Sequence, residues 1–196
     1  MNFPSQTELF WNDSIQANAD SLFHQYILEG EKVIGMAPGS IWNTKRWLPE
    51  YFVEVIRKLY KKGIKTILLG GNEDAELCQQ IADKADSNAI NLAGKLSILG
   101  SAAFIKKLPL LLTNDSAPLH LANAVQTDVI ALFGPTITSF GFAPFRENDI
   151  VLETNLECRP CGKHGHHKCP LKHFDCMKMI FPDTVFDTII QALENK

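Results

Sequence analysis

The stretch LLLTNDSAPLHLANA at residues 110–124 decides the fold, because it joins a buried strand, a polar turn and the beginning of a helix. Residues 110–113 form a short apolar run of the length of a buried strand. The turn then offers Asp115 and Ser116, which favour a helix N-terminus, and Pro118, which suits a first helical turn. A strand that leads through a short turn into a helix is typical of a parallel sheet covered by helices.

The same alternation repeats on both sides of this stretch. We predict strands at 33–37, 65–69, 89–91, 110–113, 129–133 and 149–152, and helices at 14–29, 49–62, 74–84, 97–107, after 116, and at 181–194. The strands are continuous apolar runs, which indicates that both faces of the sheet are covered. Because parallel crossovers are right-handed, the sequence predicts an α/β fold with a Rossmann-like, doubly wound parallel sheet.

Composition places the chain among ordinary globular domains, with 196 residues, 45% hydrophobic and 21% charged. We divide it into residues 1–31, an N-terminal helix and linker, and residues 32–196, the Rossmann-like domain, which contains a Cys/His-rich segment at 153–176. The net charge of −3 argues against a nucleic-acid partner. No membrane span or secretory signal is evident, so we expect a cytoplasmic protein.

Polar and glycine-rich residues follow four of the predicted strands, and the carboxyl ends of parallel strands share one edge of the sheet. These residues stand at 38–40 with 45–47, at 70–74, at 113–120 and at 134–136. Such an edge predicts a nucleotide or another anionic ligand. Neither G-x-G-x-x-G after a strand nor G-x-x-x-x-G-K-[ST] occurs, which disfavours a nicotinamide enzyme and a P-loop NTPase.

The residue types at this edge fit a diphosphate ester. Backbone N–H groups of Ser116 and Ala117 at a helix start are free to meet an anion, and Lys45 adds a cation. Glu73 follows a glycine pair, where a carboxylate can accept both hydroxyls of a ribose.

Each of these assignments has a structural alternative. Asp115 or Ser116 can simply cap the helix, and Glu73 can favour a helix N-terminus through the dipole. Lys45 can be a solvated surface lysine, and His120 a core histidine. Their convergence at one sheet edge favours the ligand-binding interpretation.

Five motifs in this order resemble the ADP-heptose:lipopolysaccharide heptosyltransferases of glycosyltransferase family 9. They are APGSIWNTKRWLPEYF (37–52), GGNEDAEL (70–77), TNDSAPLHLANA (113–124), ALFGPT (131–136), and CRPC with the later CP and HFDCM (158–177). The last is typical of the heptosyltransferase II group. The resemblance covers roughly residues 32–196.

The resemblance implies the C-terminal, donor-binding half of a GT-B glycosyltransferase. The family transfers heptose, with inversion, from ADP-heptose to the inner core of lipopolysaccharide. Its partners would be that donor, the lipid A-linked core acceptor and an N-terminal acceptor domain with the catalytic base, expected before residue 1. We therefore expect this chain alone to bind donor but to transfer poorly. The family's reaction on a lipid-linked acceptor also implies peripheral contact with the inner face of the inner membrane.

The resemblance also implies roles for individual residues. Lys45 and Asp115 would take part in catalysis. The donor would be bound by Ser40, Lys45, Glu73, Asp115, Ser116, Ala117, His120, Pro135 and Thr136. No metal is required for this chemistry. Ala117 replaces a usual glycine, which is harmless at an ordinary helix start and strained if the position needs a positive φ.

Four cysteines, Cys158, Cys161, Cys169 and Cys176, crowd the Cys/His-rich segment with four histidines. A C-x2-C pair with two further thiols suits a structural zinc ion. The alternatives are a reduced, packed loop, an iron–sulfur cluster, a disulfide formed after oxidation, and a basic surface that touches an anionic acceptor. Without an export signal, disulfides are the poorer default.

Three other functions remain open at this point. The chain can be a non-catalytic nucleotide-sugar binding module, part of another GT-B enzyme such as a nucleotide-sugar epimerase, or a small zinc-dependent interaction protein built on the Cys/His-rich segment.

Overall fold

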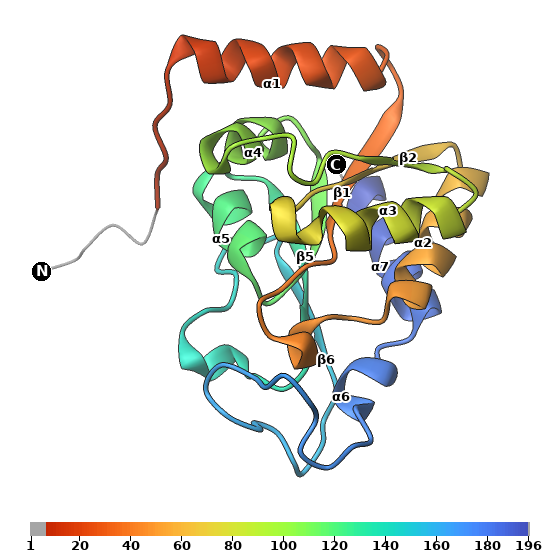
Figure 1. The fold of residues 1–196 in the computed structure, drawn as a ribbon, viewed down its shortest axis with the longest axis vertical. Coiled ribbons are helices and arrows are strands. Elements are labelled where there is room, and N and C mark those ends of the chain that lie inside the picture. The colour runs from red at the N-terminus through yellow and green to blue at the C-terminus, as the bar shows by residue number, and fades with distance from the viewer. Residues whose placement is uncertain (1–6, 196) are drawn as a thin grey trace, which may run out of the picture.

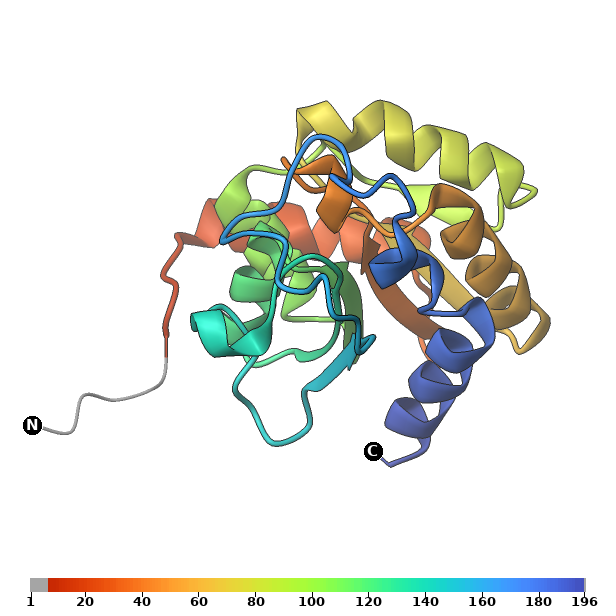
Figure 2. The same ribbon diagram turned by 90° about the horizontal axis from the view of Figure 1, so that it is seen from below.

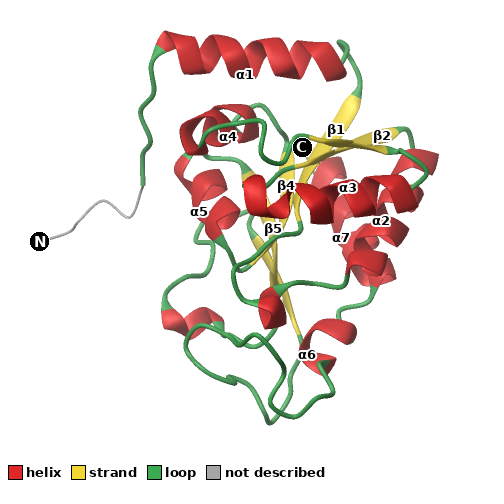
Figure 3. Cartoon of the chain, viewed as in Figure 1, coloured by secondary structure: helices red, strands yellow, loops and turns green. Residues whose placement is uncertain are grey.

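Residues 7–195, which the computed structural model describes, fold around a six-stranded parallel sheet (Figures 1 and 3). Its strand order is β3-β2-β1-β4-β5-β6, the doubly wound order that the sequence predicts. The strands are β1 (Lys32–Ala37), β2 (Ile64–Leu68), β3 (Ala89–Asn91), β4 (Leu110–Asn114), β5 (Asp128–Phe133) and β6 (Ile150–Glu153).

Helices cover both faces of the sheet, as the continuous apolar strands require. They are α1 (Asp13–Tyr26), α2 (Pro49–Lys61), α3 (Ala75–Lys84), α4 (Ile98–Ile105), α5 (Ala117–Ala124), α6 (Asp175–Lys178) and α7 (Pro182–Glu194). Short 3-10 helices η1 (Asn43–Lys45), η2 (Asn72–Asp74) and η3 (Thr138–Phe140) lie in the loops. No helix within residues 7–195 has the length and apolar character needed to cross a bilayer.

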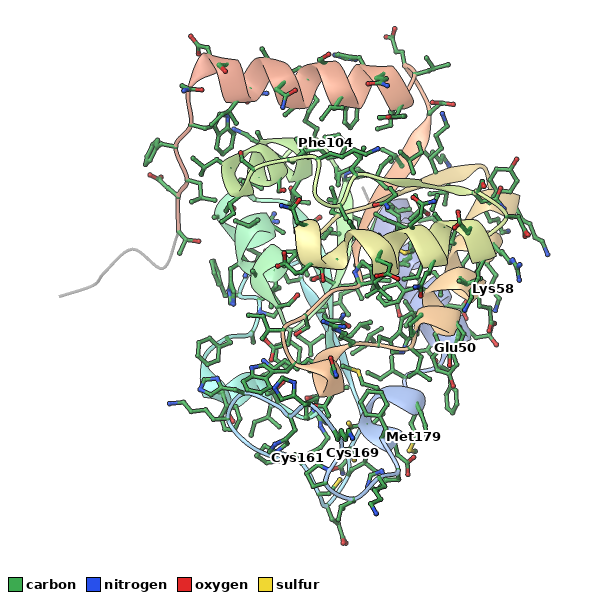
Figure 4. All side chains as sticks on the ribbon, viewed as in Figure 1. Glu50, Lys58, Phe104, Cys161, Cys169 and Met179 are labelled. Atoms are coloured by element: carbon green, nitrogen blue, oxygen red, sulfur yellow. The ribbon has the colours of Figure 1, made fainter. Side chains whose placement is uncertain are left out.

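Two apolar cores lie on the two faces. Helices α2, α3 and α7 pack on one face with Ile34 and Met36 of β1, and α1, α4 and α5 pack on the other with Val33 and Ala37. Helix α1 lies over α4, where the ring centroids of Phe23 and Phe104 are 5.7 Å apart (Figure 4). The N-terminal helix is thus packed against the sheet's own helices, while the boundary at residue 31 stays a prediction.

Most predicted elements are found within a few residues of their expected bounds. The first helix, predicted at 14–29, begins one residue earlier, and its N-cap Asn12 accepts a hydrogen bond from the Ile15 N–H at 3.0 Å. Helix α6, a single turn that begins at the end of the Cys/His-rich segment, is not among the predicted helices.

The chain order reverses between β1 and β4, which lie side by side at the centre of the sheet. In such sheets the crevice beyond the carboxyl ends at the reversal point is where ligands bind. Seen from below in Figure 2, the loops that follow β1, β4 and β5 gather at this edge with the Cys/His-rich segment across them.

Candidate functional site

A cleft of about 390 Å³ opens at the carboxyl edge of the sheet, within the size range of small-molecule sites. Loops after β1, β2, β4 and β5 line it, together with one residue of the Cys/His-rich segment. The lining residues are Gly39, Ser40, Ile41, Trp42, Lys45, Arg46, Glu73, Asp74, Asp115, Ser116, Ala117, Pro118, His120, Phe142 and His164.

A buried ion pair lies at the base of the cleft. Lys45 Nζ is 2.6 Å from Asp115 Oδ2, and the Thr136 hydroxyl donates to the same oxygen at 2.7 Å. The side chains of Lys45 and Asp115 are only 11% and 5% exposed. Lys45 is therefore not a solvated surface lysine, and the Asp115 carboxylate is engaged by Lys45 and Thr136.

The loop that carries Lys45 is anchored to the end of β4. The Asn114 side chain accepts from the Trp47 N–H at 3.1 Å and donates to the Pro38 carbonyl at 2.8 Å. Trp47 itself is 1% exposed, and its indole N–H donates to the Ile180 carbonyl. This buried anchoring fixes η1, and with it Lys45, relative to the start of α5.

Helix α5 begins at this cleft without a side-chain cap. Ser116 occupies the N-cap position, but its side chain makes no capping hydrogen bond, and Pro118 lies in the first turn, where it wastes no donor. Both Ser116 and Ala117 line the cleft. The positive end of the helix dipole is thus directed at the place where an anion would sit.

Ala117 does not have a positive φ, so alanine is unstrained as the first residue of α5. We expect Ala117→Gly to lower the free energy of unfolding by up to about 1 kcal/mol, because glycine only adds freedom to the unfolded chain. Ser87→Gly is the matched control: Ser87 has a φ of 58°, where glycine should stabilise. Urea denaturation of both variants checks the signs, and a stabilised Ala117→Gly variant would contradict the assignment.

Two acidic residues of η2 close the side of the cleft nearest β2. Glu73 is exposed at the rim, while Asp74 is half-buried and accepts from the Gly71 N–H at 3.1 Å. Burial raises the pKa of the Asp74 carboxyl above its usual value. The Asp74 carboxylate occupies the space that a Cβ at Gly39 would need, so a larger residue there would have to displace that carboxylate.

Of the remaining predicted site residues, two line the cleft and two lie elsewhere. Ser40 lines the cleft, and His120 is exposed on α5 with its ring centroid 6.4 Å from that of Phe142, so the core-histidine alternative is wrong. Pro135 and Thr136 are not among the cleft-lining residues. Thr136 lies behind Asp115, and Pro135 lines a separate small cavity of the Cys/His-rich segment.

Sequence reasoning missed several cleft residues, among them Trp42, Asp74, Phe142 and His164. Asp74 lies next to a predicted residue and could have been included on the same grounds. His164 had no usable signal, because only the folded chain brings its segment across the cleft.

The four clustered cysteines are free thiols at the end of the molecule opposite α1, where Figure 4 shows Cys161 and Cys169 near each other. Cys161, Cys169 and Cys176 line a cavity of about 10 Å³ together with His166. Burial raises the pKa of the Cys176 thiol to about 11 and also raises that of Cys161. Within residues 7–195, no group of three or more His, Cys, Asp or Glu side chains is already arranged to hold a metal ion.

Comparison with known proteins adds the following. The family model "Glycosyltransferase family 9 (heptosyltransferase)" matches residues 3–173. Lipooligosaccharide heptosyltransferase 2 of Campylobacter jejuni is 32% identical over 170 residues, which cover 85% of this chain and 52% of that protein. Lipopolysaccharide heptosyltransferase 2 of Escherichia coli is 28% identical over 123 residues, or 60% of this chain and 35% of that protein.

Two solved structures share the fold. E. coli ADP-heptose lipopolysaccharide heptosyltransferase II has a TM-score of 0.75 at 22% identity, over 96% of this chain and 54% of that one. A family 9 glycosyltransferase from Veillonella parvula has a TM-score of 0.82 at 24% identity, with the same coverage. The chain spans about half the length of the two Campylobacter jejuni heptosyltransferases that it matches. The sequence match over most of the chain and the doubly wound sheet agree: the chain belongs to glycosyltransferase family 9, the heptosyltransferases.

Proposed function

We propose that this chain is the donor-binding part of a heptosyltransferase, binding ADP-heptose for inverting transfer to the inner core of lipopolysaccharide. The observation that carries the proposal is the cleft itself, in which the Lys45–Asp115 pair and the uncapped start of α5 face the same space. Family membership and the names of the relatives supply the sugar and the acceptor.

Each part of the donor would meet a suitable group. The diphosphate would lie between Lys45 and the N–H groups at the start of α5, where the charge of the ammonium and the helix dipole add. Glu73, at the exposed rim, would accept the ribose hydroxyls. Ser40 and Asp115 would face the heptose, Thr136 and Pro135 would support this turn, and His120 would line the cleft beside it.

The proposed reaction is a direct displacement. An acceptor hydroxyl gives its proton to a carboxylate base as its oxygen attacks the anomeric carbon, and the bond from that carbon to the phosphate oxygen breaks. Attack opposite the leaving group inverts the configuration. ADP departs with the bonding electrons, and Lys45 and the start of α5 would stabilise its developing charge. These groups would do so without a metal ion at the donor site.

The base and the acceptor site are proposed to belong to an acceptor-binding domain, because the chain matches about half of its relatives. The acceptor would be the lipopolysaccharide core on lipid A, which would place the enzyme in the cytoplasm at the inner face of the inner membrane.

Calorimetric titration with ADP and ADP-heptose tests the proposal. We expect both to bind this chain at one site, with little or no release of ADP when an acceptor is added to the chain alone. No binding of either compound would reject the donor-site assignment. Turnover at the rate of a full two-domain enzyme would reject the need for a second domain.

Glu73→Ala should weaken binding of ADP much more than binding of inorganic diphosphate, because only ADP carries the ribose. Loss of hydrogen bonds to a charged acceptor is worth about 1.5–3 kcal/mol. Glu76→Ala is the control, since Glu76 is also exposed on the same helical stretch but does not line the cleft. Equal losses for ADP and diphosphate would contradict the ribose assignment.

A further inference from the structure

The Cys/His-rich segment crosses the proposed donor cleft although neither strand pairing nor a helix fixes its position there. Residues 154–174 contain neither strand nor helix. Irregular segments of this length in compact domains are commonly functional or held by a metal. What fixes this one is a set of specific contacts to the two loops that position Lys45 and Asp115.

The first attachment is to η1, one residue before Lys45. The Thr44 N–H donates to the His166 carbonyl at 3.0 Å, and the His166 N–H donates to the Thr44 hydroxyl at 2.7 Å. The Thr44 hydroxyl also lies 2.9 Å from the His166 carbonyl. Residues far apart in sequence are thus joined by reciprocal backbone and side-chain bonds.

Gly165 allows the backbone of the Cys/His-rich segment to approach η1 closely. It has a φ of +85°, and a Cβ there would lie 3.1 Å from Thr44 Oγ1 and 3.3 Å from Lys45 Cγ. The backbone of the segment therefore lies directly against the Lys45 side chain. Trp42 and His167 add a ring contact, with centroids 5.0 Å apart.

The second attachment is to the loop after β5, which carries Thr136, the hydrogen-bond donor to Asp115. The Cys161 N–H donates to the Pro135 carbonyl at 2.9 Å. The Arg159 guanidinium is nearly buried and donates to the Thr136 carbonyl at 2.8 Å and to the Phe133 carbonyl at 3.2 Å. The segment thus holds the second partner of Asp115 as well as the loop of Lys45.

The cysteines lie between these two attachments. Thr44 and Pro135 line the same cavity as Cys161, Cys169 and Cys176. Its volume of about 10 Å³ has room for a single ion or water molecule and is too small for an organic ligand. Cys158 lies beside it, since the Cys161 thiol donates to the Cys158 carbonyl at 3.1 Å.

We propose that Cys158, Cys161, Cys169 and Cys176 bind one zinc ion, which braces Thr44 and Pro135 and so positions Lys45 and Asp115 for the donor. Four thiolates from one segment are a closed structural zinc set. His166 Nε2 is not a ligand atom in this arrangement, because it is 2.7 Å from the Cys161 carbonyl, which can only accept. Binding releases the thiol protons to solvent and replaces the contact of Cys158 Sγ with His173 and the hydrogen bond of the Cys161 thiol to the Cys158 carbonyl.

Metal analysis tests the site. Full-length chain purified without chelator should contain one equivalent of zinc, and cobalt substituted for it should show thiolate-to-metal charge-transfer absorption. Cys169→Ala should lose both signals, and Cys78→Ala should keep them, because Cys78 is buried in α3 outside the cluster. Wild-type protein that holds no stoichiometric metal, or iron in place of zinc, overturns the assignment.

We call the zinc-held contacts of the segment to Thr44 and Pro135 the brace. Its role in donor binding rests on the proposed function and needs a separate readout. Thr44→Val should keep its zinc but bind ADP about two- to tenfold more weakly, the effect of one lost hydrogen bond. Thr188→Val is the control, since the Thr188 hydroxyl also bonds a carbonyl, at an exposed turn of α7. Removal of zinc from the wild type should speed hydrogen exchange of the Thr44 amide.

Two results would overturn the brace: unchanged ADP affinity in Thr44→Val, or exchange of the Thr44 amide that zinc does not affect. The exchange readout does not depend on ADP. If zinc protects Thr44 but the wild type binds no ADP, the proposed function fails while the metal-held attachment is supported.

Discussion

Asp115→Ala is expected to lower the free energy of unfolding by about 3–5 kcal/mol, because it leaves the Lys45 ammonium buried without its counter-charge. The two side chains are almost fully buried and 2.6 Å apart, and the Thr136 hydroxyl would lose its acceptor as well. Urea denaturation at neutral pH measures the effect. Replacing both partners together, as Lys45→Met with Asp115→Leu, should cost less than Asp115→Ala alone, because no charge is then left buried.

An exposed ion pair provides the comparison. Glu54 pairs with Lys58 one turn along α2 at 3.1 Å, and its side chain is 49% exposed, so Glu54→Ala should cost no more than about 0.5 kcal/mol. If Asp115→Ala costs as little as Glu54→Ala, the Lys45–Asp115 pair is not the buried, coupled unit described above.

Lys45→Met is expected to weaken ADP binding about 10- to 150-fold, corresponding to about 1.5–3 kcal/mol for a charge-assisted contact to phosphate. Methionine keeps much of the side-chain volume and removes the charge, and Lys45→Arg should recover part of the affinity. Lys61→Met, at an exposed position at the far end of α2, is the matched control. Thermal unfolding of each variant must accompany the titration, because Lys45→Met also leaves Asp115 unpaired.

Unchanged ADP affinity in a folded Lys45→Met variant would show that Lys45 serves only as the partner of Asp115. Equal weakening in Lys61→Met would show that the net charge, rather than this contact, governs binding.

The sequence predicts the fold well because most of its strands are continuous apolar runs between glycine and proline turns. The three residues of β3 are correctly bounded, and α2 and α7 begin at Pro49 and Pro182, within one residue of their predicted starts. Elements of a single turn, such as η1 and α6, are missed because three or four residues carry no periodic signal.

The site is predicted less completely, for a physical reason. Residue types at strand ends identify Lys45, Glu73 and Ser116 as neighbours of one ligand, since parallel strands bring their ends together. Their mutual pairing depends on loop paths that span long sequence separations. Lys45 and Asp115 are 70 residues apart, and Thr44 and His166 are 122 apart, and no spacing rule connects them.

The central claim is that ADP binds at the carboxyl edge of β1 and β4, between Lys45 and the start of α5. Titration of ADP into 15N-labelled chain, followed by amide NMR, tests it most directly. We predict that the largest shifts occur at Gly39, Glu73 and Ala117, with saturation at one ligand per chain. Largest shifts instead at the other side of the molecule, in the cavity beside α1 that Trp11 and Lys106 line, would contradict the claim.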